Sequence, residues 1–75
     1  MFDEKSRAIL VLGVLNDVFA DVRNIIYYLQ DFIASHPDWK EDFERIGLNE
    51  VLEAAMTLER LTLEKMNELK KIVET

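Results

Sequence analysis

The sequence predicts an all-α protein, an antiparallel helical hairpin of two long helices joined through a short middle helix. Two long segments carry apolar residues at the alternating three- and four-residue spacing of an amphipathic helix. A short segment with the same spacing lies between them, with Pro37 at its start and Gly47 at its end, as helix boundaries favour. We expect a single helical domain over residues 1–75, with helices at about 4–34, 37–46 and 50–73.

The first helix carries two overlapping apolar registers. One register comprises Val11, Leu15, Val18, Val22, Ile25, Leu29 and Phe32. The other comprises Leu12, Leu15, Phe19, Val22, Ile26, Leu29 and Ile33. A helix with two adjacent apolar registers lies in the groove between two neighbours. The two registers share Leu15, Val22 and Leu29, and we predict that neighbours pack against these three residues from two sides. We predict that the first register forms a dimer or partner interface. We expect the opposite face to be exposed to solvent and call it the wet face; it carries Asn16, Asp17, Ala20, Arg23, Asn24, Tyr27 and Asp31.

The helix boundaries follow from capping residues. Asp3 and Ser6 are both acceptable N-caps for the first helix, and Gly47 is expected to end the middle helix in a left-handed conformation. Asn49 is the expected N-cap of the third helix. The middle helix presents Trp39, Phe43 and Ile46 on one face. The broad apolar stripe of the third helix comprises Val51, Leu52, Ala55, Leu58, Thr62, Leu63, Met66, Leu69, Ile72 and Val73.

Glu59 is the one carboxylate inside the apolar stripe of the third helix. It is either a buried group with a raised pKa that fixes a dimer register, or an edge residue that reaches solvent or pairs with Arg23 or Arg60. We favour the edge position, because carboxylates are rarely buried. Thr62 beside it is expected to bond to its own helix backbone.

The lengths of the helices predict self-association. At about 1.5 Å per residue, the middle helix covers about 15 Å of a first helix that is about 40 Å long. An apolar strip therefore stays bare on a single chain, and such strips mark interfaces. A two-fold homodimer with a four-helix-type bundle is the simplest arrangement. The alternative is a complex in which the strip receives a different protein.

The charge pattern indicates a basic partner protein. The net charge is −6, and residues 8–55 contain nine acids and three bases. The predicted acidic partner surface comprises Asp38, Glu41, Asp42 and Glu44. Such a surface disfavours direct binding to nucleic acid or to an anionic membrane, both of which require Lys and Arg. Tyr27, Tyr28 and Trp39 are aromatic contact candidates. They either pack on the middle helix through Trp39 and Phe43 or form a binding hot spot.

No residue pattern indicates catalysis, a metal or a cofactor. The chain has no cysteine and one histidine, His36, which precedes a proline and is expected to serve in a turn or cap. We therefore predict a protein that is not an enzyme. The apolar run Ala8–Leu15 is too short to span a membrane. With Val18-Phe19-Ala20 it could also form a signal-peptide cleavage region, but the helical phase continues across that point and the leading segment lacks net positive charge. The absence of cysteine suits a cytoplasmic location.

These patterns predict a non-enzymatic helical protein–protein interaction module, a homodimer that binds and modulates another protein. The alternative is a small acidic inhibitor of a nucleic-acid-handling protein, of the kind encoded by mobile elements. In that alternative the carboxylates take the place of phosphates.

Overall fold

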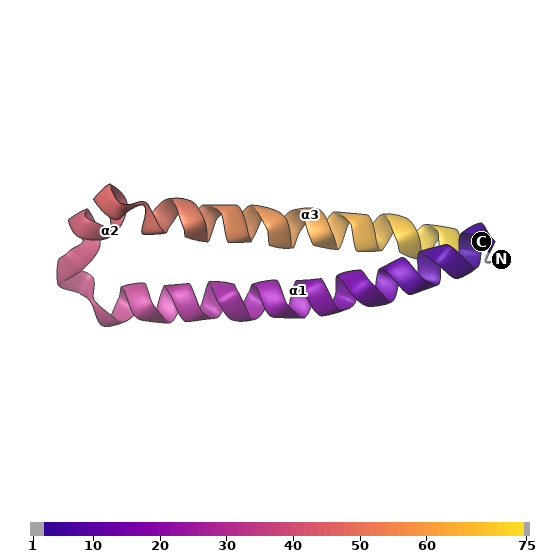
Figure 1. Cartoon of the computed structure of the whole chain (residues 1–75), viewed down its shortest axis with the longest axis horizontal. Coiled ribbons are helices and arrows are strands. Elements are labelled where there is room, and N and C mark those ends of the chain that lie inside the picture. The colour runs from indigo at the N-terminus through magenta and orange to yellow at the C-terminus, as the bar shows by residue number, and fades with distance from the viewer. Residues whose placement is uncertain (1–2, 75) are drawn as a thin grey trace.

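The computed structural model describes residues 3–74 as an elongated, wholly helical molecule of 54 × 19 × 16 Å. Helix α1 (Glu4–Ser35) is followed by a short 3-10 helix η1 (Pro37–Trp39), α2 (Lys40–Ile46) and α3 (Leu48–Glu74). Figure 1 shows α1 and α3 side by side and running in opposite directions, with α2 at one end and both termini at the other. No strand occurs in the described residues, so the predicted all-α class is confirmed. We call the end formed by η1 and α2 the closed end.

Helix α1 begins and ends at residues whose polar groups satisfy its free backbone groups. Asp3 is the N-cap, and its carboxylate accepts a hydrogen bond from the backbone N–H of Ser6 at 2.7 Å. At the other end, the hydroxyl of Ser35 donates to the carbonyl of Asp31 at 2.7 Å, and the backbone N–H of His36 donates to Ile33 at 3.2 Å. The helix stops there because His36 precedes Pro37, which disfavours the helical conformation at His36.

The middle segment begins as a 3-10 turn rather than as an α-helix. Pro37 occupies the first helical position, as predicted, but α-helical geometry starts only at Lys40. Gly47 ends α2 with a φ of 95°, and its N–H donates to the carbonyl of Phe43 at 3.0 Å. The predicted left-handed terminator is therefore confirmed, since this conformation favours glycine.

Helix α3 begins at Leu48, two residues before the predicted start. The N–H of Val51 donates to the carbonyl of Gly47 at 3.2 Å, so Gly47 ends one helix and opens the next. Asn49 consequently lies inside α3, and its prediction as the N-cap is wrong. The physical reason is that the left-handed turn at Gly47 redirects the chain at once and needs no further linking residue.

The core is a single layer of side chains between the two long helices, continued at the closed end by Phe43 of α2. The buried residues among those described are Ala8, Val22, Ile26, Phe43, Thr62 and Met66. Helix α1 therefore packs on α3 through its second register, the one that contains Ile26. Thr62 is buried without an orphaned hydroxyl, because its Oγ1 donates to the carbonyl of Leu58 at 2.7 Å, as predicted.

The solvent-facing side of α1 matches its prediction, since all seven residues expected on the wet face are exposed. Gly13 also lies on the surface, with nothing within 4 Å of where a Cβ would stand. Within residues 3–74, none of the helices combines the length and the hydropathy that crossing a membrane requires.

Candidate protein interaction surfaces

A run of large apolar side chains stays exposed along both long helices. Each of its eight members has between 39% and 73% of its surface accessible. We call this set the apolar strip: Val11, Val14, Ile25, Tyr28, Phe32, Val51, Leu58 and Leu61. The steps between its α1 members are three, eleven, three and four residues, which keep them on one flank of that helix. The α3 members have the same kind of spacing.

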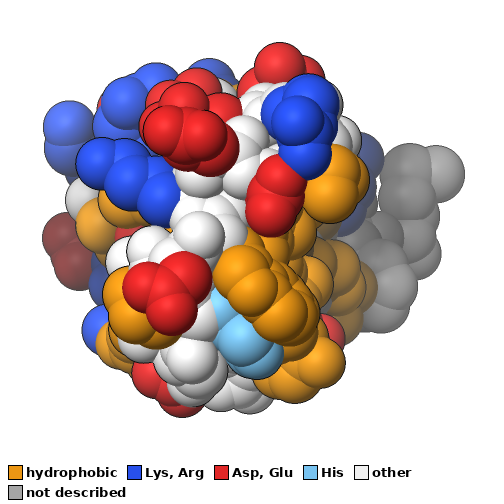
Figure 2. All heavy atoms as spheres, turned by 90° about the vertical axis from the view of Figure 1, so that its left-hand side faces the viewer, with side chains coloured by type: hydrophobic (Ala, Val, Ile, Leu, Met, Phe, Trp, Pro, Cys, Tyr) orange, Lys and Arg blue, Asp and Glu red, His pale blue; other side chains and the backbone are white. Residues whose placement is uncertain are grey.

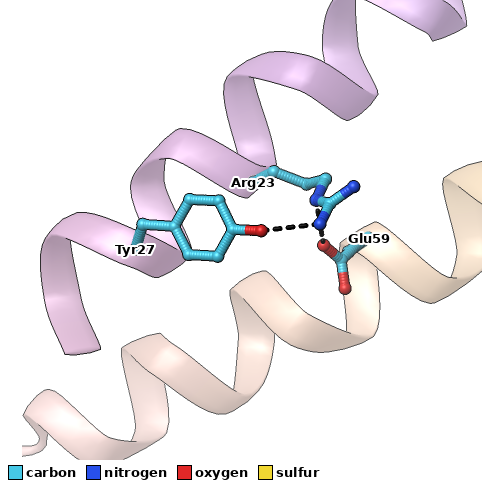
Figure 3. Close-up of polar contacts among 3 residues, drawn as sticks. All are labelled: Arg23, Tyr27 and Glu59. Atoms are coloured by element: carbon cyan, nitrogen blue, oxygen red, sulfur yellow. Dashed lines mark hydrogen bonds and ion pairs between the residues drawn. The ribbon is translucent and has the colours of Figure 1, made fainter.

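An ion pair on the opposite flank shows that the two halves of the strip share one face. Nε of Arg23 on α1 lies 3.6 Å from Oε2 of Glu59 on α3. Figure 3 shows Arg23 between Glu59 and Tyr27, whose hydroxyl accepts a hydrogen bond from the guanidinium at 2.6 Å. Successive residues of a helix are about 100° apart, so Ile25 lies on the opposite flank of α1 from Arg23. For the same reason, Leu61 lies on the opposite flank of α3 from Glu59. The α1–α3 pair therefore has one face with the polar trio and one with the apolar strip.

The structure divides the predicted interface register between the core and the surface. Val11, Ile25 and Phe32 are exposed, whereas Leu15, Val18 and Leu29 are partly buried. Val22 is 5% exposed and belongs to the core, because α3 covers the centre of α1. Val22 is therefore not available to a partner, although the predicted interface register includes it.

The strip also contains residues that the predicted register omitted. Val14 and Tyr28 lie on the same flank as Val11 and Ile25, but Asp21 interrupts the spacing between them. Leu58 and Leu61 face this side from α3. The signal for Val14 was present in the sequence as a third apolar register, which only the single acid at position 21 breaks.

Four rings form a cluster at the closed end. His36 stacks on Trp39 with ring centroids 4.2 Å apart, and Phe32 lies 4.6 Å from His36 and 5.7 Å from Phe43. Trp39 meets Phe43 edge-on at 6.1 Å. Nδ1 of His36 lies 2.9 Å from the carbonyl oxygen of Phe32, so the imidazole caps the end of α1. The expected turn or capping role of His36 is confirmed.

The two tyrosines do not join this cluster. Among residues 3–74, no ring contact links Tyr27 or Tyr28 to Trp39 or Phe43. Tyr27 instead packs under Arg23, whose Cζ lies 5.6 Å from the ring centroid. Tyr28 is the more exposed of the two, at 73%. These ring contacts do not support packing of the tyrosines through Trp39 and Phe43, and the role of Tyr27 and Tyr28 as a binding hot spot stays a prediction.

A groove with a volume of about 570 Å³ opens beside the cluster. It is lined by Phe32, Trp39, Asp42, Phe43, Arg45, Ile46 and Leu48. We call it the closed-end groove. Figure 2 looks at this end and shows hydrophobic side chains gathered beside the histidine, with acidic and basic side chains around them. Helical spacing predicts that Trp39, Phe43 and Ile46 share one face, but it does not predict this groove.

The four residues of the predicted acidic partner surface all lie at the closed end. Asp38, Glu41 and Glu44 are exposed, whereas Asp42 is partly buried and pairs with Arg45. Within residues 3–74, no three His, Cys, Asp or Glu side chains converge as a metal site would require. The acids therefore form a solvated negative surface beside an apolar groove.

The fold and these surfaces define an all-α protein built on two long packed helices. No protein-family model matches the sequence, and no solved structure matches it. The chain is 71% identical over 72 residues to an uncharacterized protein of Archaeoglobus fulgidus, covering 96% of this chain and 95% of that protein. The chain belongs to the same family as this archaeal protein.

Proposed function

We propose that the protein is a non-enzymatic helical interaction module that forms a homodimer through the apolar strip. In this proposal α1 and α3 act as a hairpin, and two hairpins pack face to face as a four-helix bundle. A second part of the proposal is that the dimer binds and modulates a basic protein through its acidic closed end.

The observation that carries the proposal is the bare apolar strip on one face of the α1–α3 pair. Soluble monomers rarely expose contiguous apolar patches larger than a few hundred Å². Isolated apolar side chains on a surface need no explanation, but eight on one face of two adjacent helices do. A two-fold axis would place each strip against its own copy and remove both from water.

The thin core also supports self-association. Five hydrophobic residues and one threonine are buried in residues 3–74, and no large side chain there is fully enclosed. A chain of this size rarely gains more than about 3–5 kcal/mol from a single core. Covering the strip would add a second apolar layer, with α1 between α3 and the second copy.

Substitutions on the two flanks test the homodimer. We expect Ile25→Asp with Leu61→Asp to give a monomer by light scattering, because two unpaired carboxylates would be buried in the interface. The matched control is Ile9→Asp with Met56→Asp on the other flanks. Ile9 is 51% exposed against 50% for Ile25, and Met56 is 46% exposed against 47% for Leu61. The control should stay a dimer; equal behaviour of the two variants would contradict the proposal.

Charge reversal tests the proposed basic partner. Proteins captured from a cell extract at low salt should be lost at high salt, and also from the variant with Glu41, Asp42 and Glu44 changed to Lys. A control with Asp17, Glu64 and Glu74 changed to Lys makes the same change in net charge away from the closed end. Capture that survives the first variant would contradict a role for this surface.

A second candidate function is inhibition of a nucleic-acid-handling protein. The observation that favours it is the exposure of Asp38, Glu41 and Glu44 together at one end of the molecule. Carboxylates in place of phosphates would then occupy the basic surface that binds DNA or RNA. Displacement of the captured protein by added DNA or RNA would support this function, and co-capture with nucleic acid would reject it.

A further inference from the structure

We infer that the closed-end groove binds a large apolar side chain carried on a basic segment of the partner protein. The inference rests on the proposed function, because it names the chemistry of the partner that the closed end binds. The groove lies at the closed end, on η1, α2 and the adjoining ends of α1 and α3, and it shares only Phe32 with the strip that is proposed to hold the dimer.

The groove is a preformed apolar site. Its floor, Phe43, is 6% exposed and meets Phe32 and Trp39 through ring contacts. The stacking of Trp39 on His36 at 4.2 Å fixes one wall. Trp39 nevertheless leaves 48% of its surface in water and Ile46 leaves 78%. A volume of about 570 Å³ lies within the range of small binding sites, so one or two large side chains fit.

The charged residues that line the groove, Asp42 and Arg45, pair with each other, and the net negative charge of the closed end as a whole favours a basic occupant. Residues 38–45 carry four acids and two bases. The ion pair between Asp42 and Arg45 neutralises one of each, which leaves Asp38, Glu41 and Glu44 against Lys40. An apolar side chain flanked by Lys or Arg therefore gains electrostatic complementarity, whereas one flanked by acids is repelled.

A second copy of this chain fits the groove less well. The apolar residues that it offers lie on α1, where residues 8–35 contain three acids and one base, and on α3, where residues 48–74 contain six acids and four bases. Both helices therefore have an excess of acids, and seating either one in the groove would place acids beside acids. The charge pattern thus favours a partner of different composition over another copy of the same chain.

Trp39 is the only tryptophan of the chain, so its fluorescence reports on the groove directly. The probe is a synthetic 18-residue amphipathic peptide of Leu and Lys without aromatic residues. Two matched peptides serve as controls, one with Ala in place of Leu and one with Glu in place of Lys. We expect a saturable blue shift of Trp39 emission with the Leu/Lys peptide alone, since docking removes the indole from water.

Two variants of the full chain locate the binding. Ile46→Ser removes an exposed groove wall and should weaken the peptide about tenfold, the equivalent of one lost apolar contact. Glu41→Lys with Glu44→Lys should weaken it at least as much and reduce its salt dependence. Asp17→Lys with Glu64→Lys makes the same charge change elsewhere and should leave the affinity within about twofold. Circular dichroism confirms that each variant is helical.

Several outcomes would overturn the inference. These are an unchanged emission spectrum, equal binding of the Ala/Lys peptide, or affinity unaffected by Ile46→Ser. A shift of Trp39 emission on dilution of the protein alone would show that a second copy fills the groove. A monomer that still binds the Leu/Lys peptide would reject the homodimer and retain the groove. A dimer that does not bind the Leu/Lys peptide would reject the groove and retain the homodimer.

Discussion

Ile25 and Ile26 are adjacent isoleucines of α1 that the structure assigns to different surfaces. Ile26 is 5% exposed in the layer against α3, whereas Ile25 is 50% exposed on the apolar strip. The same truncation at each position therefore separates folding from association. We predict that Ile26→Ala destabilises the folded chain and that Ile25→Ala chiefly weakens the proposed dimer.

The magnitude for Ile26→Ala follows from its burial. Buried Ile-to-Ala changes cost about 2–5 kcal/mol, and the cost depends on how far the cavity collapses. Helix α1 packs on one long neighbour, so the site relaxes easily and we expect about 2–3 kcal/mol. With a urea dependence of about 1 kcal/mol per molar for a small domain, the unfolding midpoint should fall by about 2–3 M.

The expected loss of dimerisation free energy for Ile25→Ala follows from the part of the Ile25 surface that is exposed in the single chain. Full burial of an isoleucine contributes about 1.5–3 kcal/mol, and half of that remains to be gained, or about 1 kcal/mol per chain. Two-fold symmetry doubles the effect to about 2 kcal/mol per dimer, a roughly 30-fold rise in the dissociation constant.

Urea unfolding at two protein concentrations distinguishes the two effects. At a concentration where the chain is monomeric, Ile25→Ala should change the midpoint little, while Ile26→Ala should lower it as calculated. At a concentration where the wild type is dimeric, both variants should be less stable than the wild type. Equal midpoint shifts for both variants at the low concentration would refute the assignment of Ile25 and Ile26 to different surfaces.

Three further predictions address single elements. Gly47→Ala should cost about 1–2 kcal/mol by urea unfolding, because a φ of 95° strains any residue with a Cβ, although the nearest atom, Oε2 of Glu50, is 3.9 Å away; the helical Gly13→Ala should stabilise by up to about 1 kcal/mol, and a cost there would contradict its open position. The hydrogen bond from the backbone N–H of Ser6 lowers the pKa of Asp3, so this cap stabilises α1 above the unfolded-state pKa and is lost as pH falls through the lower folded-state pKa. The NMR shift of the Ser6 amide should therefore titrate below about pH 3.9, and a midpoint above that value would contradict the cap. Glu59→Gln removes a half-exposed ion pair across α1 and α3 and should change the free energy of unfolding by less than about 1 kcal/mol, whereas a loss above about 2 kcal/mol would indicate a buried charge.

The three helices could be predicted because local chemistry decides their boundaries. A glycine such as Gly47 readily adopts the left-handed conformation that ends a helix. Asp3 caps α1 by accepting a hydrogen bond from the backbone N–H of Ser6, three positions along the chain. The start of α3 could not be placed, because Asn49 and Gly47 both suit a helix N-terminus and only the packed turn decides between them.

Which apolar register faces α3 could not be read from the sequence. Both registers contain Leu15, Val22 and Leu29, and either one buries a continuous stripe. The choice depends on the position of α3, which leaves Ile26 5% exposed and Ile25 50% exposed. The pairing of Glu59 was likewise open between Arg23 and Arg60, since the distance across two helices depends on their relative register.

The candidate interaction surfaces were predictable in part. The exposure of Val11, Ile25 and Phe32 follows from a helix with more apolar faces than long neighbours. The closed-end groove was not predictable, because helical spacing places Trp39, Phe43 and Ile46 on one face without showing that only Phe43 is covered. Phe43 is covered because the rings of Phe32, His36 and Trp39 pack against it, whereas Ile46 is 78% exposed.

Sedimentation equilibrium of the wild-type chain over a wide range of concentrations tests the proposed homodimer most directly. The bare strip predicts a mass twice that of the 8.8 kDa chain at high concentration, with dissociation to monomers on dilution. A single species of 8.8 kDa at every concentration up to the solubility limit would contradict the proposal.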